Sequence, residues 1–247
     1  MAATFYWTYT PPDALPNINV WYYADDGTKF NKTSSIANNT SVTSWQNAGG
    51  LTSHDWNSTG GKRPVWYSNQ KNGKGVVRFD RTGNQFLSIN PIAYMQGLPA
   101  VTMFVVFKTA NVANGTRICT TTDTNGFRWG QTANTWIAGF AGATCNVTSS
   151  TADTQYHHVT LIYDGTASGN ANKLKIRLDS VEQTLSFTGT VGNTTSNTAS
   201  DFYGGVDADG SSNYWDGDIC EMMFFTRVLN AGEVNSVENY ITTKWAI

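Results

Sequence analysis

Short apolar runs alternate with polar turns along most of this chain. The longest run, residues 101–109 (VTMFVVFKT), is apolar at successive positions, which is typical of a strand buried on both faces in the middle of a sheet. In residues 173–179, by contrast, Leu174, Ile176 and Leu178 alternate with charged side chains. This period of two indicates an antiparallel strand with one face in solvent. The pattern therefore predicts a β protein.

Turn-forming residues separate the other apolar runs, and together the runs predict about a dozen strands. Strands are expected at residues 19–26, 75–80, 85–89, 157–165, 181–187, 201–206 and 218–228, with shorter ones between 115 and 148. The segment RTGN at 81–84 joins two of these strands and predicts a hairpin. The polar stretch 27–63 is too long for one ordinary connection. Runs at this spacing favour an all-β sandwich.

One helix is expected after the last strand. Asn230 is placed to cap it, and Glu233 stands three residues later in the capping-box position. The expected buried face consists of Val234, Val237, Ile241 and Trp245, and the expected solvent face of Asn235, Glu238 and Lys244. The sequence thus predicts a short C-terminal helix with one apolar side.

The composition gives no reason to expect a highly charged partner. Charged residues make up 14% of the chain and aromatic residues 13%, and the formal net charge is −2. Nothing in this balance favours nucleic acid or an anionic membrane as a partner. No apolar run is long enough to span a membrane, and the N-terminus lacks the features of a signal peptide.

The first 17 residues differ from the rest of the chain. Prolines at positions 11, 12 and 16 favour an extended conformation, and several aromatic residues lie along the segment. We therefore divide the chain into an N-terminal arm, residues 1–17, and one domain, residues 18–247. The arm is expected to dock either on a neighbouring subunit, such as another virion protein or a second copy of this chain, or on its own domain.

Three cysteines, Cys119, Cys145 and Cys220, are too few for a disulfide scaffold and lack the paired spacing of a zinc site. Cys119 and Cys145 can pair if their strands are adjacent, whereas free buried cysteine is also common. Cys220 lies in an apolar run and is expected in the core.

Three stretches resemble the laminin G-like branch of the concanavalin A-like lectin/glucanase superfamily, in its bacterial and phage form. The first is HHVTLIYDG at 157–165, followed by KLKIRLDSVE at 173–182. The second is YWDGDICEMMFFTRVLNAGEVNSVENYITTKWAI at 214–247. The third is NVWYYADDGTKF at 19–30, followed by GVVRFDRTGNQFL at 75–87. Their order and spacing make the resemblance fairly specific.

The resemblance implies an all-β fold, a two-sheet antiparallel jelly-roll sandwich of the concanavalin A-like type with a short C-terminal helix, over roughly residues 18–247. Two positions depart from the family pattern: Tyr156 replaces the usual Trp, and Ser180 replaces a turn Gly. Neither threatens the fold. The fold carries lectins, adhesins, hydrolases and structural modules, so it does not imply one function.

The segment DGDICE at 216–221 imitates a glycosidase signature. Asp216, Asp218 and Glu221 have the spacing E-x-D-x-x-E of glucanases with this fold, but an Asp stands where the nucleophilic Glu is needed. A turn is expected at Gly217, and on a regular strand Glu221 points away from Asp218, so that only a bulge reunites them. We therefore predict that the protein is not an enzyme. A glycan hydrolase is the least favoured alternative.

The same region contains the best candidate metal site. Asp207, Asp209, Asn213 and Asp216 lie within ten residues of one another, and calcium prefers six to eight oxygen ligands. Calcium is the one cofactor that the sequence suggests. An ordinary solvated loop is the alternative.

Sugar binding normally combines an aromatic ring for stacking with a few polar groups. Most tryptophans are expected in the core. Trp56 and Tyr214, which lie in predicted loops, are the best candidates for a glycan platform, with His54 and Trp215 beside them.

We interpret the chain as a non-enzymatic structural or adhesion protein of a bacteriophage virion surface, either a capsid decoration protein or a fibre protein, with glycan binding as an additional expectation. The alternative is a stand-alone bacterial lectin or adhesin, located outside the cell or on its surface. Neither a nucleic acid nor membrane insertion is expected.

Overall fold

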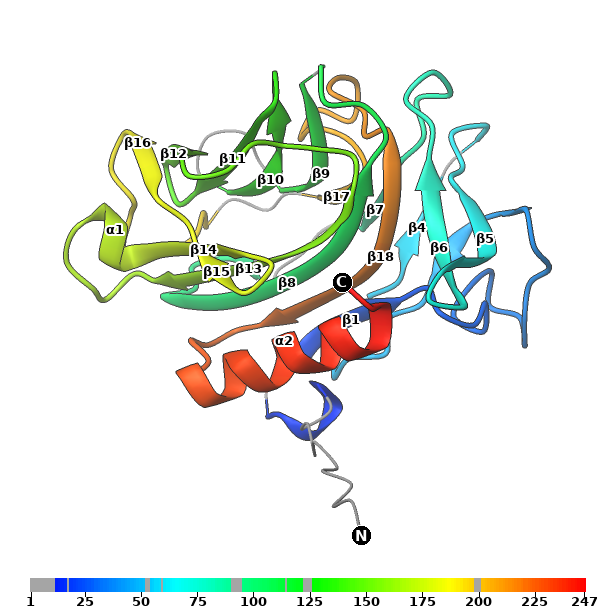
Figure 1. Cartoon of the computed structure of the whole chain (residues 1–247), viewed down its shortest axis with the longest axis horizontal. Helices are drawn as coiled ribbons and strands as arrows, with labels where there is room; N and C mark the ends of the chain where they lie inside the picture. The colour runs from blue at the N-terminus through cyan, green and yellow to red at the C-terminus, as the bar shows by residue number, and fades with distance from the viewer. Residues whose placement is uncertain are drawn as a thin grey trace, which may run out of the picture.

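The computed structural model describes residues 12–16, 18–51, 54–58, 60–89, 95–113, 115–121, 126–197 and 201–247. Within these residues the chain forms two antiparallel sheets of nine strands each, which stack on each other (Figure 1). The predicted all-β sandwich is confirmed. The predicted C-terminal helix is also present, as α2 (Ala231–Trp245). The other described helices are the short η1 (Pro12–Ala14) and α1 (Asn170–Lys173).

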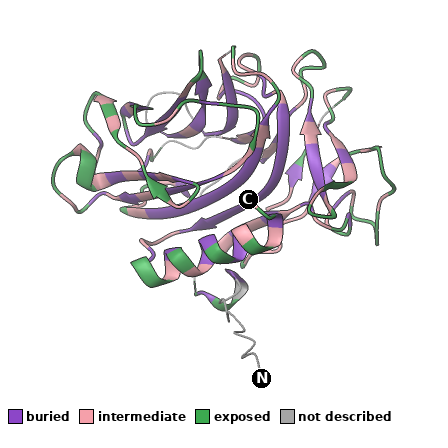
Figure 2. Ribbon diagram, in the orientation of Figure 1, coloured by how far each residue is buried: buried purple, intermediate pink, exposed green. Residues whose placement is uncertain are grey.

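The first sheet has two long, curved strands at its centre. In spatial order it contains β15 (Val181–Glu182), β14 (Leu174–Leu178), β13 (Tyr156–Asp164), β8 (Ala100–Thr109), β18 (Gly217–Phe225), β6 (Lys74–Phe79), β5 (Val65–Lys71) and β2 (Thr40–Ser41), while β1 (Ile18–Tyr23) also pairs with β18. Strands β8 and β18 are buried along almost their whole length (Figure 2). This confirms the predicted central strand at 101–109.

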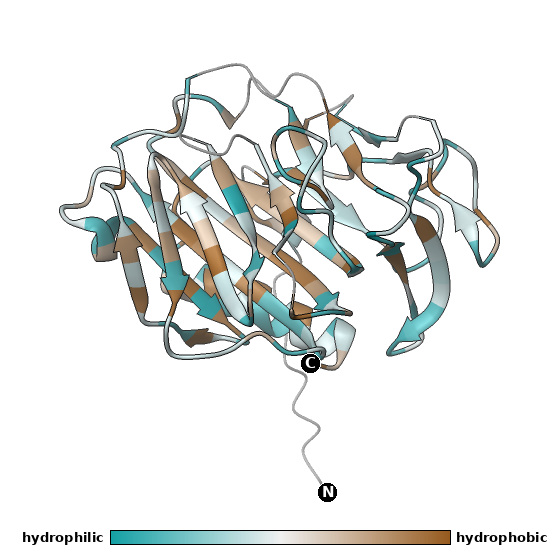
Figure 3. Ribbon diagram, turned by 90° about the horizontal axis from the view of Figure 1, so that it is seen from above, coloured by the Kyte–Doolittle hydropathy of each residue, from teal (hydrophilic) through white to brown (hydrophobic). Residues whose placement is uncertain are grey.

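The second sheet covers one face of the first. In spatial order it contains β16 (Leu185–Thr188), β12 (Ala143–Val147), β11 (Thr135–Phe140), β10 (Phe127–Thr132), β9 (Thr116–Thr120), β17 (Phe202–Gly204), β7 (Leu87–Ile89), β4 (Trp56–Asn57) and β3 (Ser44–Trp45). Hydrophobic and hydrophilic residues alternate along many strands (Figure 3), as expected where one face of a strand meets the core.

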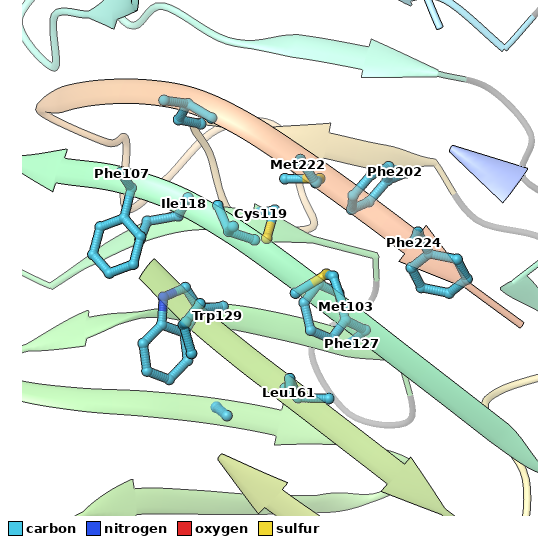
Figure 4. Packing of buried hydrophobic residues seen from close by; sticks show 14 of the residues in the cluster. Met103, Phe107, Ile118, Cys119, Phe127, Trp129, Leu161, Phe202, Met222 and Phe224 are labelled. Carbon is cyan, nitrogen blue, oxygen red and sulfur yellow. The ribbon is translucent and has the colours of Figure 1, made fainter. Parts of the chain in front are cut away.

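The main core fills the space between the sheets. Side chains from β8, β13 and β18 meet side chains from β9, β10 and β17 there (Figure 4). The residues shown include Met103, Phe107, Leu161, Met222 and Phe224 from the first sheet and Ile118, Cys119, Phe127, Trp129 and Phe202 from the second. Burial of this apolar surface is the main stabilising contribution to the sandwich.

A second apolar cluster lies on the outer face of the first sheet, beneath α2. The four predicted apolar positions of the helix are all buried in it, and Asn230 caps the helix in a capping box with Glu233, as predicted. The prediction for Glu238 is wrong, because its side chain is buried and accepts hydrogen bonds from Thr160 and Arg177. A buried carboxylate needs such partners to compensate for its lost hydration.

The hairpin predicted around residues 81–84 is wrong. Strand β6 belongs to the first sheet and pairs with β5 and β18, whereas β7 belongs to the second and pairs with β4 and β17. The turn therefore carries the chain across the sandwich. The predicted hairpin of β13 with β14 is confirmed, with Val159 opposite Leu178.

Cys119 and Cys145 do not pair. They lie on β9 and β12, which are separated by β10 and β11, so about 14 Å of sheet lies between the two strands. This exceeds the reach of a disulfide. All three cysteines are buried and free, and the predicted core position of Cys220 is confirmed.

The described end of the predicted N-terminal arm packs on the domain. Leu15 belongs to the cluster beneath α2, and the backbone carbonyl of Pro16 accepts a hydrogen bond from Arg227. Residues 1–11 of the arm lie outside the described residues. Of the described helices, none has the length and apolar character to cross a membrane.

Candidate functional site

Two acidic residues of β18 lie on the same face of the first sheet, contrary to the prediction from strand parity. The register of β18 against β8 shifts by one residue between Ile219 and Glu221, so that Cys220 forms a β-bulge. Asp218 and Glu221 consequently both point to the outer face, where their hydrogen-bond partners lie. The bulge brings together the pair that the sequence analysis had separated.

Glu221 is used to anchor α2 and β1. Its carboxylate is fully buried and accepts hydrogen bonds from the indole N–H groups of Trp21 and Trp245, at 2.7 and 2.6 Å. It also accepts one from the hydroxyl of Tyr240 at 2.9 Å, and the ammonium of Lys244 lies 3.1 Å away. These four partners saturate the carboxylate, so Glu221 has a structural role.

Asp218 is also held by its neighbours. The guanidinium of Arg78 donates two hydrogen bonds to it, at 2.7 and 3.0 Å, and the hydroxyl of Tyr156 donates a third at 2.8 Å. The hydrogen bond to Asp218 raises the pKa of Arg78. Burial, followed by the negative charge of Asp218, raises the pKa of Tyr156 and keeps its hydroxyl protonated.

The third acidic residue of the segment does not complete a catalytic set. Burial, followed by the negative charge of Asp80, raises the pKa of Asp216. A glycosidase needs two carboxylates that both reach the sugar. Asp218 and Glu221 are both enclosed by side chains of this chain, so the arrangement does not offer such a pair.

The predicted calcium loop contains an arginine next to its first acid. The carboxylate of Asp207 is buried, lies 3.4 Å from Nε of Arg117 and accepts a hydrogen bond from the side chain of Asn213. The carboxylate of Asp209 instead accepts hydrogen bonds from the backbone N–H groups of Ser211 and Ser212, and these hydrogen bonds lower its pKa. In the described part of the chain, no three His, Cys, Asp or Glu residues form a group that could hold a metal. Calcium binding stays a prediction.

The prediction that Trp56 and Trp215 contribute to a glycan platform is wrong. Trp56 is fully buried and stacks on Tyr22, with 4.7 Å between ring centroids. Trp215 is also fully buried in the core, and Tyr214 is 9% exposed. His54 is half-buried, and its backbone carbonyl accepts a hydrogen bond from Tyr22. Trp56 lies on strand β4 and Trp215 directly precedes β18, and both side chains are part of the main core between the sheets.

A row of polar side chains crosses four neighbouring strands on the outer face of the first sheet. Tyr156 on β13 lies opposite Lys108 on β8, Lys108 lies opposite Asp218 on β18, and Asp218 lies opposite Arg78 on β6. Neighbouring strands are about 4.8 Å apart, so the row spans about 14 Å. We call these four residues the cross-sheet row.

Tyrosine rings hold the cations in and beside this row. The ammonium groups of Lys108 and Lys71 lie 5.2 and 5.3 Å from the ring centroid of Tyr156, and the guanidinium of Arg78 lies 4.9 Å from that of Tyr67. These distances are in the range of cation–π interactions. The side chain of Arg78 is 42% exposed, and the other four residues, Tyr67, Lys71, Lys108 and Tyr156, are half-buried. The row is therefore a candidate site for a polar ligand.

The sequence pattern does not reveal this row. Tyr156 stands out in the sequence only as a departure from the family pattern, and neither Lys108 nor Arg78 stands out at all. Alternation along β8 places the side chain of Lys108 on one face, but the four residues are spread over 140 positions of the chain. Only the register of the strands brings them together.

The fold defines a class of protein, and a comparison of sequences specifies the family. Two stacked antiparallel sheets of this arrangement form a concanavalin A-like sandwich. The laminin G family described as the concanavalin A-like lectin/glucanases superfamily matches residues 81–235, which is more than half of the chain. This chain belongs to that family, as the resemblance had indicated. No curated protein matches it in sequence.

Solved structures show the same fold at low sequence identity. The botulinum neurotoxin type G receptor binding domain is 11% identical, with a TM-score of 0.57 over 91% of this chain and 51% of that one. A Trypanosoma rangeli sialidase in complex with 2,3-difluorosialic acid is 12% identical, with a TM-score of 0.54 over 93% of this chain and 33% of the sialidase. This chain thus spans about half or less of these proteins, and the likeness shows the fold alone.

Proposed function

We propose that this protein is a non-enzymatic glycan-binding module on the surface of an assembly, and specifically of a bacteriophage virion. The observation that carries the binding role is the cross-sheet row, where Tyr156, Lys108 and Arg78 present aromatic rings and hydrogen-bond donors on one sheet face. Carbohydrate sites in proteins combine these two kinds of group.

Two further facts support a binding role over catalysis. Asp218 and Glu221 are fully engaged in holding Arg78 and α2, as described above. The solved structures of this fold include the botulinum neurotoxin type G receptor binding domain, which associates the fold with ligand recognition. This likeness supports the proposal through the fold and not through shared residues.

The virion location rests on the sequence. The chain has a low share of charged residues, and many Thr, Asn and Gly residues supply neutral polar surface. Its first residues include Phe5, Tyr6, Trp7 and Tyr9, which suit docking on a partner subunit. A capsid decoration protein or a fibre protein has this combination of a compact module and a docking segment.

A glycan array with the full chain tests the binding role. Binding to a defined set of glycans supports it, and no binding to any glycan contradicts it. Repeating the array in EDTA tests whether binding needs calcium. Binding that is lost in EDTA and restored by added calcium shows that the site requires the metal. Release of reducing sugar from a bound glycan that disappears in Asp218→Asn would contradict the non-enzymatic role.

Purified particles test the location. The protein should be detected on virions by mass spectrometry, and a chain without residues 1–11 should fail to enter them while it still binds its glycan. Incorporation without these residues would refute the docking role of the arm. A protein found only free or on bacterial cells would instead identify a stand-alone lectin or adhesin.

A further inference from the structure

The cross-sheet row carries more positive than negative charge. Together with the neighbouring Lys71 it contains three basic side chains and one carboxylate, that of Asp218. Arg78 forms an ion pair with Asp218, so its charge is compensated. The two lysines are left in excess, although the whole chain has a formal net charge of −2. The excess is therefore local to this face of the sheet.

Lys108 is the cation of the row that is open to a ligand. Lys71 donates a hydrogen bond to the backbone carbonyl of Ala246. For Lys108, by contrast, no hydrogen bond or ion pair to any described residue is found, and its ammonium lies over the ring of Tyr156. Its three N–H donors can therefore serve a bound group.

The groups around Lys108 are in place before a ligand binds. Lys108 lies between Tyr156 and Asp218 in the register of the sheet, and the hydroxyl of Tyr156 donates a hydrogen bond to Asp218. Both neighbours belong to long strands with buried flanks, so they need little rearrangement when a ligand binds. The ammonium of Lys108 favours an anion over a neutral hydroxyl, because charge-assisted hydrogen bonds are stronger.

We propose that the cross-sheet row binds the acidic group of a glycan, a carboxylate or a sulfate, and that Lys108 contacts this group directly. This inference rests on the proposed glycan-binding function and specifies its ligand class. The ammonium of Lys71 lies beside the same Tyr156 ring and adds to the positive potential of the site. Asp218 does not repel the ligand, because Arg78 and Tyr156 share its charge.

The test compares acidic glycans with their neutral cores. An array carrying sialylated, uronic acid-containing and sulfated glycans beside the same glycans without the acidic group is probed with the full chain. We expect binding to acidic members only, and the carboxylated and sulfated sets show which anion is preferred. Binding should weaken when salt is raised from about 0.05 to about 0.5 M, because salt screens charges at a surface.

Lys108→Gln should bind the retained glycan about tenfold more weakly, and Lys108→Arg should keep most of the affinity. Lys175→Gln is the matched control. It removes a half-exposed lysine from the same sheet face, where Lys175 pairs with Ile162 and Ile162 with Thr102, six residues and about 20 Å along β8 from Lys108. This variant should bind like the wild type. Equal thermal unfolding of the three variants shows that the fold is intact.

Five results would overturn the inference. Binding to neutral glycans alone leaves the proposed function standing and refutes the acidic ligand. Equal loss of affinity in Lys108→Gln and Lys175→Gln, or no loss in either, refutes the site. Equal binding to duplex DNA and to acidic glycans shows a general polyanion surface. No binding to any glycan refutes the proposed function and the inference with it.

Discussion

Glu221 shows how a single buried charge can organise this protein. Its carboxylate joins β18 to β1 through Trp21 and to α2 through Tyr240, Trp245 and Lys244. Each partner satisfies part of the hydrogen-bonding capacity of the carboxylate, which is a condition for burying it. Glu221, one of the three acids of the DGDICE segment, is therefore a polar link between the sheet and the helix.

Glu221→Gln should lower the free energy of unfolding by about 3 kcal/mol. The amide nitrogen of Gln is a donor and would face the N–H of Trp21 or Trp245, and the charge of Lys244 would lose a buried partner. Urea unfolding measures the change. Glu182→Gln, at an exposed position on β15, should stay within about 0.5 kcal/mol of the wild type. Equal effects of the two substitutions would contradict this role.

His157 gives the stability a defined dependence on pH. Burial disfavours its charged form, but hydrogen bonds to Asp179 and Asp153, at 2.6 and 2.8 Å, outweigh that effect and raise its pKa. The folded state thus holds the proton more tightly than the unfolded state. The stabilisation is complete below the ordinary histidine pKa of about 6.5 and is lost as pH rises through the raised value.

His158 has the opposite effect. Burial lowers its pKa, so its contribution is present above the ordinary histidine value and is lost as pH falls. His157→Gln should therefore remove the loss of stability on the alkaline side and leave the loss on the acidic side. Thermal unfolding between about pH 5 and pH 9 measures both. If the variant loses as much stability as the wild type when the pH rises, His157 is not the source of that loss.

At the scale of elements, the N-terminus of α2 tests whether the capping box predicted from the sequence stabilises the helix. Asn230 accepts a hydrogen bond from the backbone N–H of Glu233, and Glu233 accepts one from the backbone N–H of Asn230. Asn230→Ala should cost about 1 kcal/mol, while Asn230→Ser should be nearly neutral because serine also caps. Thermal unfolding of the two variants decides. Equal destabilisation by Ala and Ser would mean that side-chain capping is not the source of the stabilisation.

Gly217 allows the first residue of β18 to lie close to the backbone of β8. Its φ is +151°, and a Cβ at this position would overlap the carbonyl oxygen of Lys108. Gly217→Ala should therefore destabilise the protein by about 3 kcal/mol, through both strain and displacement of the strand. Gly61→Ala is the control, because a Cβ there meets nothing within 4 Å and the residue is exposed. Similar denaturant midpoints for both variants would refute this prediction.

At the scale of the whole molecule, the N-terminal segment has two parts with different expected effects. Removal of residues 1–11 leaves Leu15 and the carbonyl of Pro16 in place with their contacts, so this truncation is the reference for the longer one. Removal of residues 1–16 should cost about 2 kcal/mol, since the buried side chain of Leu15 is lost from the cluster beneath α2. Equal melting temperatures for the two truncations would contradict this division.

The sequence by itself determined the central strand, the C-terminal helix and the fold class, but not strands β2 to β5 or the division of residues 181–187 between β15 and β16. The apolar run at 101–109, the alternation at 173–179 and the cap at Asn230 are local patterns, and each was found where it was predicted. Propensity and periodicity depend on neighbours in sequence, so they can be read without knowing the fold. The order of the three family stretches then gave the sandwich.

The tertiary structure alone decided where chemistry lies. The bulge at Cys220 reunites Asp218 and Glu221, the packing between the sheets buries Trp56, and strand register lines up Tyr156, Lys108 and Arg78. Each of these outcomes depends on contacts between segments far apart in the chain. Pairing and burial are set by the whole folded arrangement, so a local pattern can predict a strand but not the row of side chains that several strands place side by side.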